Sequence, residues 1–423
     1  MTTAPAVPSV KERVEAANAE AVGRLLRADP VLVDVAPAGE VVEGLEGRMI
    51  LHSGPPIAWE RMCGAQRGSV LGLVVFEGWA ESIEGAARLL AAGDVVLEPN
   101  HHHHGVGPMA GTTSPSLPVW VVENRTYGNR AYCRPTDAKQ QFGDHSDEAL
   151  CGIREWRDVR APAVRAALQQ MGGLPLKPLF VKALAMGDEL HNRPNALSAL
   201  VGNALAPELV KAGVATDDLV STLYWLRYDE FLGLALSMAA AKAAIEPAEG
   251  VEYATLVTAM ARNGTDFGIR VSGLPGAWFT APAPAVDGLY LPGYDAADAG
   301  RDMGDSAITE TVGWGGFVLG GAPGILALTG GTPDEALEIS RAMRTITLTS
   351  SPDYRMPVFG FEGAPVGIDI RKVVRTGVLP TIDTAIAHRD AGHPKIGGGL
   401  VRAPLNCFVD ALREFGRHYE IAG

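Results

Sequence analysis

The residues best suited to chemistry in this chain are four consecutive histidines inside a glycine-rich run, residues 100–111. Histidine is the side chain that most readily gains and loses a proton near neutral pH. The glycines of the run let main-chain N–H groups approach a ligand closely. We expect His102 and His103 to act in catalysis, and His101 and His104 to contact a substrate. The alternative is a loop that chelates a metal or is only solvated.

A second polar cluster, residues 187–193, places a carboxylate two residues before a histidine. Such a carboxylate can fix the tautomer of the histidine if the backbone turns between them, as at the end of a helix. The sequence therefore predicts Glu189 and His191 as acid–base groups and Asn192 as a substrate-binding residue.

The run 262–273 is the best candidate in the chain for holding a phosphate or a carboxylate. Its Asn-Gly pair tolerates a left-handed turn, a threonine adds a hydroxyl group, and two arginines flank the loop. The residues expected to bind the anion are Arg262, Asn263, Gly264, Thr265 and Arg270. The alternative is a plain β-hairpin turn at Asn-Gly.

Hydroxyl groups, carboxylates and bare backbone also meet in residues 304–316. This combination can orient an amide or stabilise an oxyanion. We expect Ser306 and Thr309 to bind substrate, and Glu310 to act as a base or as an orienting carboxylate. The run contains neither the Gly-Lys-Ser/Thr of a Walker loop nor Gly-x-Gly-x-x-Gly after a strand.

Smaller polar groups complete the set of candidate binding residues: Asn124, Arg130, Asp369, Arg371 and His388. An arginine in such a turn can fork onto a carboxylate or phosphate, and a solvated surface arginine is the alternative. No His-x-x-x-His pattern with a downstream ligand stands out, so we expect no metal and no cofactor. The alternative metal site would use His102, His104 and a carboxylate.

Hydrophobic periodicity indicates which elements position these groups. Residues 9–28 have the spacing of an amphipathic helix, and a second helix is expected near 80–92. Strands are expected at 31–35, 49–52, 70–76 and 119–122. Strands that alternate with helices predict an α/β domain over residues 1–150, which contains the histidine run.

Past residue 150 the sequence changes to long Ala/Leu/Met segments, which predict a helical domain over residues 151–248. Its apolar segment 231–244 is too short to cross a membrane and should be a buried helix. Residues 249–423 are expected to form an α+β domain with glycine-rich ligand loops. Its expected elements are a helix or strand at 251–260, strands at 268–272 and near 357–361, and helices at 333–344, 370–378 and 405–417. The predicted fold class is therefore mixed α/β, with several domains.

The composition excludes several classes of function. With 423 residues, 47% of them hydrophobic and 20% charged, the chain is typical of a globular enzyme rather than a disordered protein. A net charge of −13 argues against nucleic acid as a partner. Four scattered cysteines favour reduced thiols, and no stretch resembles a membrane span or a signal core. We therefore expect a cytoplasmic homo-oligomer, with a homodimer as the default.

Five longer runs resemble, in order and nearly in spacing, one known family. They are residues 54–64, 101–111, 262–273, 304–310 and 367–374. The family includes the AllG (YlbE-type) subunit of oxamate carbamoyltransferase, and the resemblance covers almost the whole chain. It implies a subunit that works with an FdrA-type partner and a small third subunit. Together they move a carbamoyl group between oxamate and phosphate during allantoin breakdown.

One loop departs from the pattern of that family. After Tyr132-Cys133 the family usually continues with a run like Asn-Glu-Gly-Leu-Gly-Lys, whereas residues 134–140 here read Arg-Pro-Thr-Asp-Ala-Lys-Gln. The Asn that commonly follows the third histidine is replaced by His104. A changed loop beside a substrate site predicts a changed substrate.

The residues and the resemblance together predict an enzyme that transfers the carbamoyl group of a small carbamoyl or amide compound. Arg262 or Arg270 would hold the anion, and His102 or His103 would polarise the carbonyl group or move a proton. Glu310 or Glu189 would serve as the base or as an orienting carboxylate. The first alternative is a hydrolase of the same compounds. The second is a non-catalytic subunit that organises an FdrA-type partner.

Overall fold

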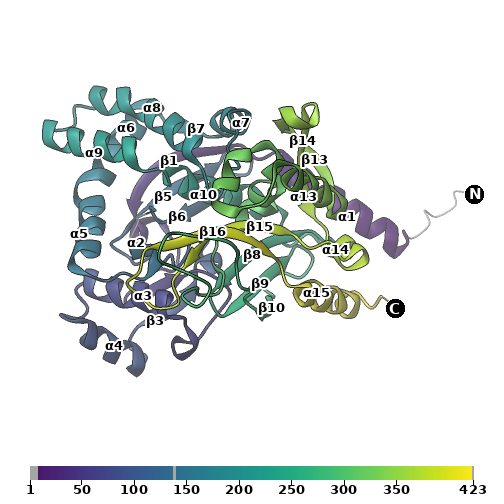
Figure 1. The fold of residues 1–423 in the computed structure, drawn as a ribbon, viewed down its shortest axis with the longest axis horizontal. Coiled ribbons are helices and arrows are strands. Elements are labelled where there is room, and N and C mark those ends of the chain that lie inside the picture. Colours follow the sequence, from purple (N-terminus) through teal and green to yellow (C-terminus); the bar gives the residue numbers. More distant parts are fainter. Residues whose placement is uncertain (1–7, 137–139, 422–423) are drawn as a thin grey trace, which may run out of the picture.

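The structure is a computed structural model that describes residues 8–136 and 140–421 (Figure 1). Helices and several small sheets alternate along the chain, so the mixed α/β fold class is confirmed. The helices are α1 (Val10–Leu26), α2 (Ala38–Val41), α3 (Gly64–Phe76), α4 (Ile83–Ala92), α5 (Asp147–Glu155), α6 (Ala161–Met171), α7 (Lys177–Ala185), α8 (Asn195–Lys211), α9 (Thr216–Tyr228), α10 (Leu232–Ile245), α11 (Ile308–Thr311), α12 (Leu326–Thr329), α13 (Pro333–Ile346), α14 (Ile370–Thr376) and α15 (Leu405–His418).

One sheet has the strand order β4-β6-β5-β1-β7. Its strands are β1 (Pro30–Pro37), β4 (Gly105–Val106), β5 (Pro118–Asn124), β6 (Arg130–Cys133) and β7 (Leu174–Pro175). Helix α10 packs against β5 and β6, and every one of its residues is buried. Alanines dominate this helix, and their small side chains let it approach the sheet closely.

Two further sheets hold much of the second half of the chain. One has the order β10-β9-β8-β12, and the other has the order β11-β16-β15. Their strands are β8 (Val257–Asn263), β9 (Asp266–Val271), β10 (Phe279–Pro282), β11 (Asp287–Tyr290), β12 (Met303–Gly304), β15 (Thr381–Ala387) and β16 (Lys395–Arg402). Strands β15 and β16 cross the middle of the molecule in Figure 1. The remaining pairs are β2 (Met49–His52) with β3 (Val96–Pro99), which are parallel, and β13 (Thr347–Met356) with β14 (Glu362–Ile368), which are antiparallel.

Local signals in the sequence fix several helix ends. Ser9 and Glu12 form a capping box at the start of α1, which satisfies main-chain N–H groups that have no partner in the helix. Helix α4 ends at Gly93, whose left-handed conformation (φ 76°) suits glycine.

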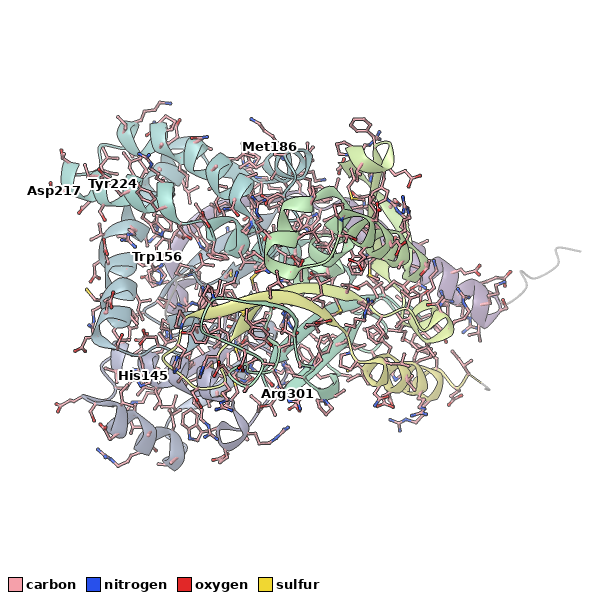
Figure 2. All side chains as sticks on the ribbon, viewed as in Figure 1. His145, Trp156, Met186, Asp217, Tyr224 and Arg301 are labelled. Atoms are coloured by element: carbon pink, nitrogen blue, oxygen red, sulfur yellow. The ribbon has the colours of Figure 1, made fainter. Side chains whose placement is uncertain are left out.

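Aromatic packing joins the first sheet to the helical layer. Trp120 of β5 lies 5.1 Å from Trp156, ring centre to ring centre, and Trp156 lies 5.2 Å from Trp225 of α9. Trp156, labelled in Figure 2, also donates a hydrogen bond to the carbonyl of Pro118. Residues from before and after position 150 therefore share one continuous core. The three-domain division stays a prediction.

Most of the expected elements are confirmed, and two are wrong. Residues 70–76, expected as a strand, belong to helix α3. A short apolar run fits a buried strand and a buried helix equally well, and only packing decides. Within α3, Gly68 and Gly72 let the helix lie against Gly143 and His145. The strand expected near 357–361 is also wrong, because Pro357–Phe359 forms a 3₁₀ turn between β13 and β14.

In the described part of the chain, no single helix is long and apolar enough to cross a membrane. Helix α9 and the segment Leu232–Ala248 pass the length and composition test only as a pair, which is bent by 79°.

Candidate active site

Three side chains from distant parts of the chain meet in the interior. His191 lies in the loop between α7 and α8, Glu310 lies in α11, and Asp383 lies in β15. The Nδ1 atom of His191 is 2.8 Å from Oε1 of Glu310 and 3.3 Å from Oδ1 of Asp383. All three side chains are buried. We call these residues the buried triad.

Helix α11 and the loop that follows it shape the triad. The main-chain N–H of Gly316 donates a hydrogen bond of 3.0 Å to Oε1 of Glu310, and the hydroxyl of Thr309 donates one of 3.0 Å to Oε2. Gly315 has φ 58°, and a Cβ atom at this position would lie 2.1 Å from Oε1 of Glu310 and 2.9 Å from Oδ1 of Asp383. Only glycine allows the backbone to lie this close to the two carboxylates.

The electrostatics of the triad are governed by its burial. Burial raises the pKa of Glu310 to about 8 and lowers the pKa of His191. Burial and the neighbouring carboxylates raise the pKa of Asp383 well above its ordinary value. The oxygens of Asp383 accept no hydrogen bond from a hydroxyl or amide group of the described residues, and their close neighbours are His191 and the carboxyl group of Glu310. A buried carboxylate that lies against a second carboxyl group is costly, so this arrangement needs a physical explanation.

Next to the triad lies a buried ion pair. The guanidinium of Arg262 donates to Asp302 through Nε (2.7 Å) and through Nη2 (3.0 Å). It also donates to the carbonyl of Gly304 (2.8 Å) and to the hydroxyl of Thr384 (3.1 Å). Arg262 therefore holds β8, β12 and β15 together, and its donors are committed to protein groups.

Asp305 connects the histidine run to the centre. Its carboxylate accepts hydrogen bonds from the main-chain N–H groups of Gly54 (2.7 Å) and Gly107 (2.8 Å) and from the amide of Asn100 (3.0 Å). The Nε2 atom of His101 lies 3.6 Å from Oδ1. Burial raises the pKa of Asp305 to about 7 despite these donors. The histidine run and Arg262 thus both contact the segment 304–306.

A small cavity lies beside the triad. Its polar lining includes His191, Asn192, Ser306, Thr384 and Lys395. The volume in which the centre of a water molecule fits is about 20 Å³. The Nδ2 atom of Asn192 is buried and has no hydrogen-bond partner among the described residues. Burial lowers the pKa of Lys395. A larger groove of about 570 Å³ lies over α13, but none of these groups lines it.

The structure brings part of the expected site together. Glu189, His191, Asn192, Arg262, Ser306, Thr309 and Glu310 lie in or directly beside this centre. Glu189 is fully buried, and its Oε1 atom accepts a hydrogen bond of 2.5 Å from the main-chain N–H of Arg193. Its Oε2 atom has no partner among the described residues.

The four histidines point in different directions. His101 is buried against Trp278, with ring centres 5.6 Å apart. The Nδ1 atom of His102 lies 3.3 Å from Glu98, and its Nε2 atom accepts a hydrogen bond from Trp278. His103 contacts the carbonyl of Glu43 (3.0 Å), and His104 contacts Glu246 (2.9 Å). None of the four is among the described residues that line the cavity.

The Asn-Gly turn has the structure of the alternative, a β-hairpin between β8 and β9. The side chain of Asn263 accepts hydrogen bonds from the main-chain N–H groups of Thr265 and Asp266. Gly264 has φ 79°, and the hydroxyl of Thr265 donates to the carbonyl of Arg61. The hydrogen bonds of this turn are made within the protein, and its binding of an anion stays a prediction.

The remaining candidates make local contacts. Arg270 lies 3.4 Å from Glu249, and Arg130 pairs with Glu123 at 2.9 Å. Asn124 caps the turn between β5 and β6 and donates to the carbonyl of Ala243. Asp369 is the N-cap of α14 and binds Arg371 at 2.8 Å, as two neighbours in a structural pair would. His388 stacks on His393, with ring centres 3.7 Å apart.

Sequence reasoning missed several residues of this centre: Asn100, Asp302, Asp305, Thr384, Asp383 and Lys395. A signal for Asp383 was present in the sequence. It is the one charged residue of β15, between Ile382 and Thr384 in a strand whose residues are all buried. A lone acid in a fully buried strand is unusual unless it is paired or functional.

The loop that departs from the family pattern is described in part. Asp137, Ala138 and Lys139 lie outside the described residues. Arg134 is fully buried and donates hydrogen bonds to the carbonyl groups of Pro135 and Thr112 and to the side chain of Gln140.

Fold and site define the chain as a mixed α/β protein with a buried, charged centre beside a small polar cavity. The chain belongs to the family of the oxamate carbamoyltransferase subunit AllG. The sequence profile of that family matches residues 95–306. The resemblance found in the sequence is thereby confirmed.

Two proteins of Escherichia coli (strain K12) are similar to this chain. The chain is 45% identical to one named uncharacterized protein YahG, over 97% of this chain and 88% of the relative. It is 42% identical to the oxamate carbamoyltransferase subunit AllG, over 94% of this chain and 97% of the relative. A crystal structure of a conserved protein of unknown function from Enterococcus faecalis V583 matches with a TM-score of 0.96 and 41% identity. That match covers 97% of this chain and 99% of the other.

Proposed function

We propose that the chain is a subunit of a carbamoyltransferase whose substrate is oxamate or a closely related small amide that carries a carboxylate. The observation that carries this proposal is the 42% identity to the AllG subunit over 94% of the chain. The relative is named a subunit, which supports a complex of several chains. An FdrA-type protein is the partner that we propose.

The lining of the cavity suits such a substrate. Oxamate carries a carboxylate next to a carboxamide, so it offers one negative charge and several oxygen acceptors. Lys395 supplies a cation, Asn192 supplies an unused amide N–H donor, and Ser306 and Thr384 supply hydroxyl groups. The cavity has room for only about one or two water molecules. Substrate entry therefore requires the cavity to widen.

The transfer itself needs one base and one leaving group. The amide nitrogen of the acceptor forms a bond to the carbamoyl carbon, while the bond from that carbon to the phosphate oxygen breaks. Phosphate leaves with the electron pair, and the proton of the amide nitrogen passes to a base. We assign this role to Glu189, whose Oε2 atom is buried and has no partner among the described residues.

The experiment is an assay of phosphate release from carbamoyl phosphate in the presence of oxamate, with this chain alone and with an FdrA-type partner subunit. We expect Lys395→Met and Asn192→Ala to lower kcat/KM for oxamate by about 10- to 100-fold, because each removes a buried donor to the substrate. Lys211→Met is the control, since Lys211 is an exposed lysine on α8.

Other results would favour the alternative functions. Release of ammonia or CO₂ from the amide without phosphate would identify a hydrolase. Unchanged turnover of the assembled complex with both cavity variants would leave the chain as a non-catalytic subunit that organises its partner.

A further inference from the structure

We propose that the buried triad of His191, Glu310 and Asp383 binds one divalent metal ion of the Mn²⁺ or Zn²⁺ type. Binding of the ion stands on geometry and charge alone. Its role toward a substrate rests on the proposed function.

The spacing of the donor atoms fits a metal centre. Nitrogen and carboxylate ligands lie about 2.0–2.2 Å from such ions, so neighbouring ligand atoms lie about 2.8–3.5 Å apart at tetrahedral or octahedral angles. The Nδ1 atom of His191 is 2.8 Å from Glu310 and 3.3 Å from Asp383. The ligand atoms of all three residues lie within 4.8 Å of one another.

The surroundings of the Asp383 carboxylate are the second line of evidence. A fully buried carboxylate normally accepts several hydrogen bonds or binds a cation. Asp383 accepts no hydrogen bond from a hydroxyl or amide group of the described residues, and its close neighbours are His191, 3.3 Å away, and the carboxyl group of Glu310. A metal ion between Asp383, Glu310 and His191 would satisfy this carboxylate.

Charge balance supports the same conclusion. Three buried carboxylates, Glu189, Glu310 and Asp383, lie around the centre, and the ammonium group of Lys395 faces Glu189 and Asp383. Arg262 also attracts the carboxylate of Glu310, but its own charge is matched by Asp302. With these three carboxylates ionised and Lys395 charged, the four groups carry an excess of two negative charges. One divalent ion neutralises it.

The residues around the triad hold its side chains in fixed orientations, as the residues around metal ligands do. Thr309 and the main chain of Gly316 hold the carboxylate of Glu310 by hydrogen bonds, as outer partners do in metal sites. The bare backbone of Gly315 closes the side of the cluster that a Cβ atom would fill. His191 also lines the cavity, so an ion bound here has water or substrate available for its open positions.

A metal ion would also define the class of substrate. In oxamate the carboxylate oxygen and the amide oxygen are placed to close a five-membered ring on one cation. Such a chelate leaves the amide nitrogen pointing away from the ion and makes its proton easier to remove. The ion would then select small amides that carry an adjacent carboxylate.

The test is a titration of the metal-free full-length chain with Mn²⁺. Binding is measured as the loss of the EPR signal of free Mn²⁺, and Zn²⁺ serves as a competitor. We expect one tight site per chain, and we expect Asp383→Asn to weaken it by at least about 30-fold. Asp188→Asn is the matched control, because Asp188 is a buried carboxylate outside the triad. It should leave the affinity within about 3-fold of the original chain.

The histidine run needs its own control, since it could bind metal adventitiously. The double variant His102→Gln/His104→Gln should keep the tight site. Loss of binding in that variant, with binding kept in Asp383→Asn, would overturn the proposal. Absence of a tight site in the original chain would also overturn it, and Glu310 and Asp383 would then share a proton instead.

Addition of oxamate separates this inference from the proposed function. A changed EPR spectrum of bound Mn²⁺ and tighter Mn²⁺ binding support the chelate. Tight Mn²⁺ binding that oxamate does not alter would overturn the chelate but keep the metal site. Carbamoyl transfer by a chain that binds no metal would overturn the metal site but keep the proposed function.

Discussion

Arg262 and Asp302 face each other in a two-point contact, with Nε 2.7 Å from Oδ2 and Nη2 3.0 Å from Oδ1, and both side chains are fully buried. We expect Arg262→Met to lower the free energy of unfolding by about 3–5 kcal/mol, because it leaves a buried carboxylate without its cation. Urea denaturation at pH 7 measures this change. Arg130→Met, which breaks an exposed pair with Glu123, should cost less than about 1 kcal/mol. Equal losses in the two variants would contradict a structural role for the buried pair.

Glu246 gives the stability of the protein a defined dependence on pH. Burial would raise its pKa, but the Lys242 ammonium 2.8 Å away and the His104 hydrogen bond outweigh burial and lower the pKa to about 2 from 4.5. A carboxylate with a lowered pKa contributes stability above the unfolded pKa, and this contribution is lost as the pH falls through the folded pKa. The contribution is about 3 kcal/mol at neutral pH.

We therefore expect the original chain to lose this stability between about pH 4.5 and pH 2, and we expect Glu246→Gln to lack that part of the pH dependence. Denaturation curves at a series of pH values measure both. Glu98→Gln, which removes a carboxylate that is about two-fifths exposed beside His102, is the control. An identical pH dependence in the original chain and Glu246→Gln would refute the assignment.

Gly315 is the most restrictive position of the centre. Gly315→Ala places a Cβ atom 2.1 Å from Oε1 of Glu310, so the carboxylate must leave His191. Gly276 has a similar positive φ of 79° but no atom within 4 Å of an added Cβ, so Gly276→Ala isolates the backbone strain. We expect Gly276→Ala to cost about 1 kcal/mol of stability and keep full Mn²⁺ affinity. Gly315→Ala should cost more and lose Mn²⁺ binding, and equal effects of the two substitutions would exclude a special role for Gly315.

Substitution of His102 and His103 tests the catalytic role that the sequence predicts against the positions of the two rings in the structure. If either ring took part in proton transfer, the double variant His102→Gln/His103→Gln would lose about 100-fold or more in turnover. His102 is held by Glu98 and Trp278 and His103 by the carbonyl of Glu43, none of which belongs to the triad, so we expect a loss of less than about 10-fold. Steady-state turnover of the assembled complex decides, with circular dichroism to verify that the variant is folded.

The histidine run also shows what the sequence could not reveal. Residues 100–103 form a 3₁₀ turn, in which successive side chains point about 120° apart. His101, His102 and His103 therefore point in three directions, and His104 follows the turn in a left-handed conformation (φ 57°), so the adjacency of the four says nothing about a shared site. By contrast, α10 was predictable from an all-round apolar composition, because only a buried helix tolerates it.

The chemistry of the centre was predictable by residue type but not by partner. His191 and Glu310 stand in polar runs that suggest function, and the structure brings them to 2.8 Å. Asp383 lies in β15, and the mostly apolar sequence around it predicts only a strand of the hydrophobic core. Its contact with His191 spans 192 positions, from 191 to 383, and no local pattern encodes a pairing over that distance. Helix α3, predicted from the sequence as a strand, shows the same limit. Its glycines permit close packing against segments that are distant in the sequence, and the sequence does not reveal these contacts.

The position of Asp383 on β15 has a consequence for the synthesis of the protein. The ribosome adds His191 to the chain 192 positions before Asp383, so a nascent or truncated chain that ends before β15 has an incomplete ligand set. The chain therefore becomes able to bind the ion only after β15 has been synthesised and has packed beside His191.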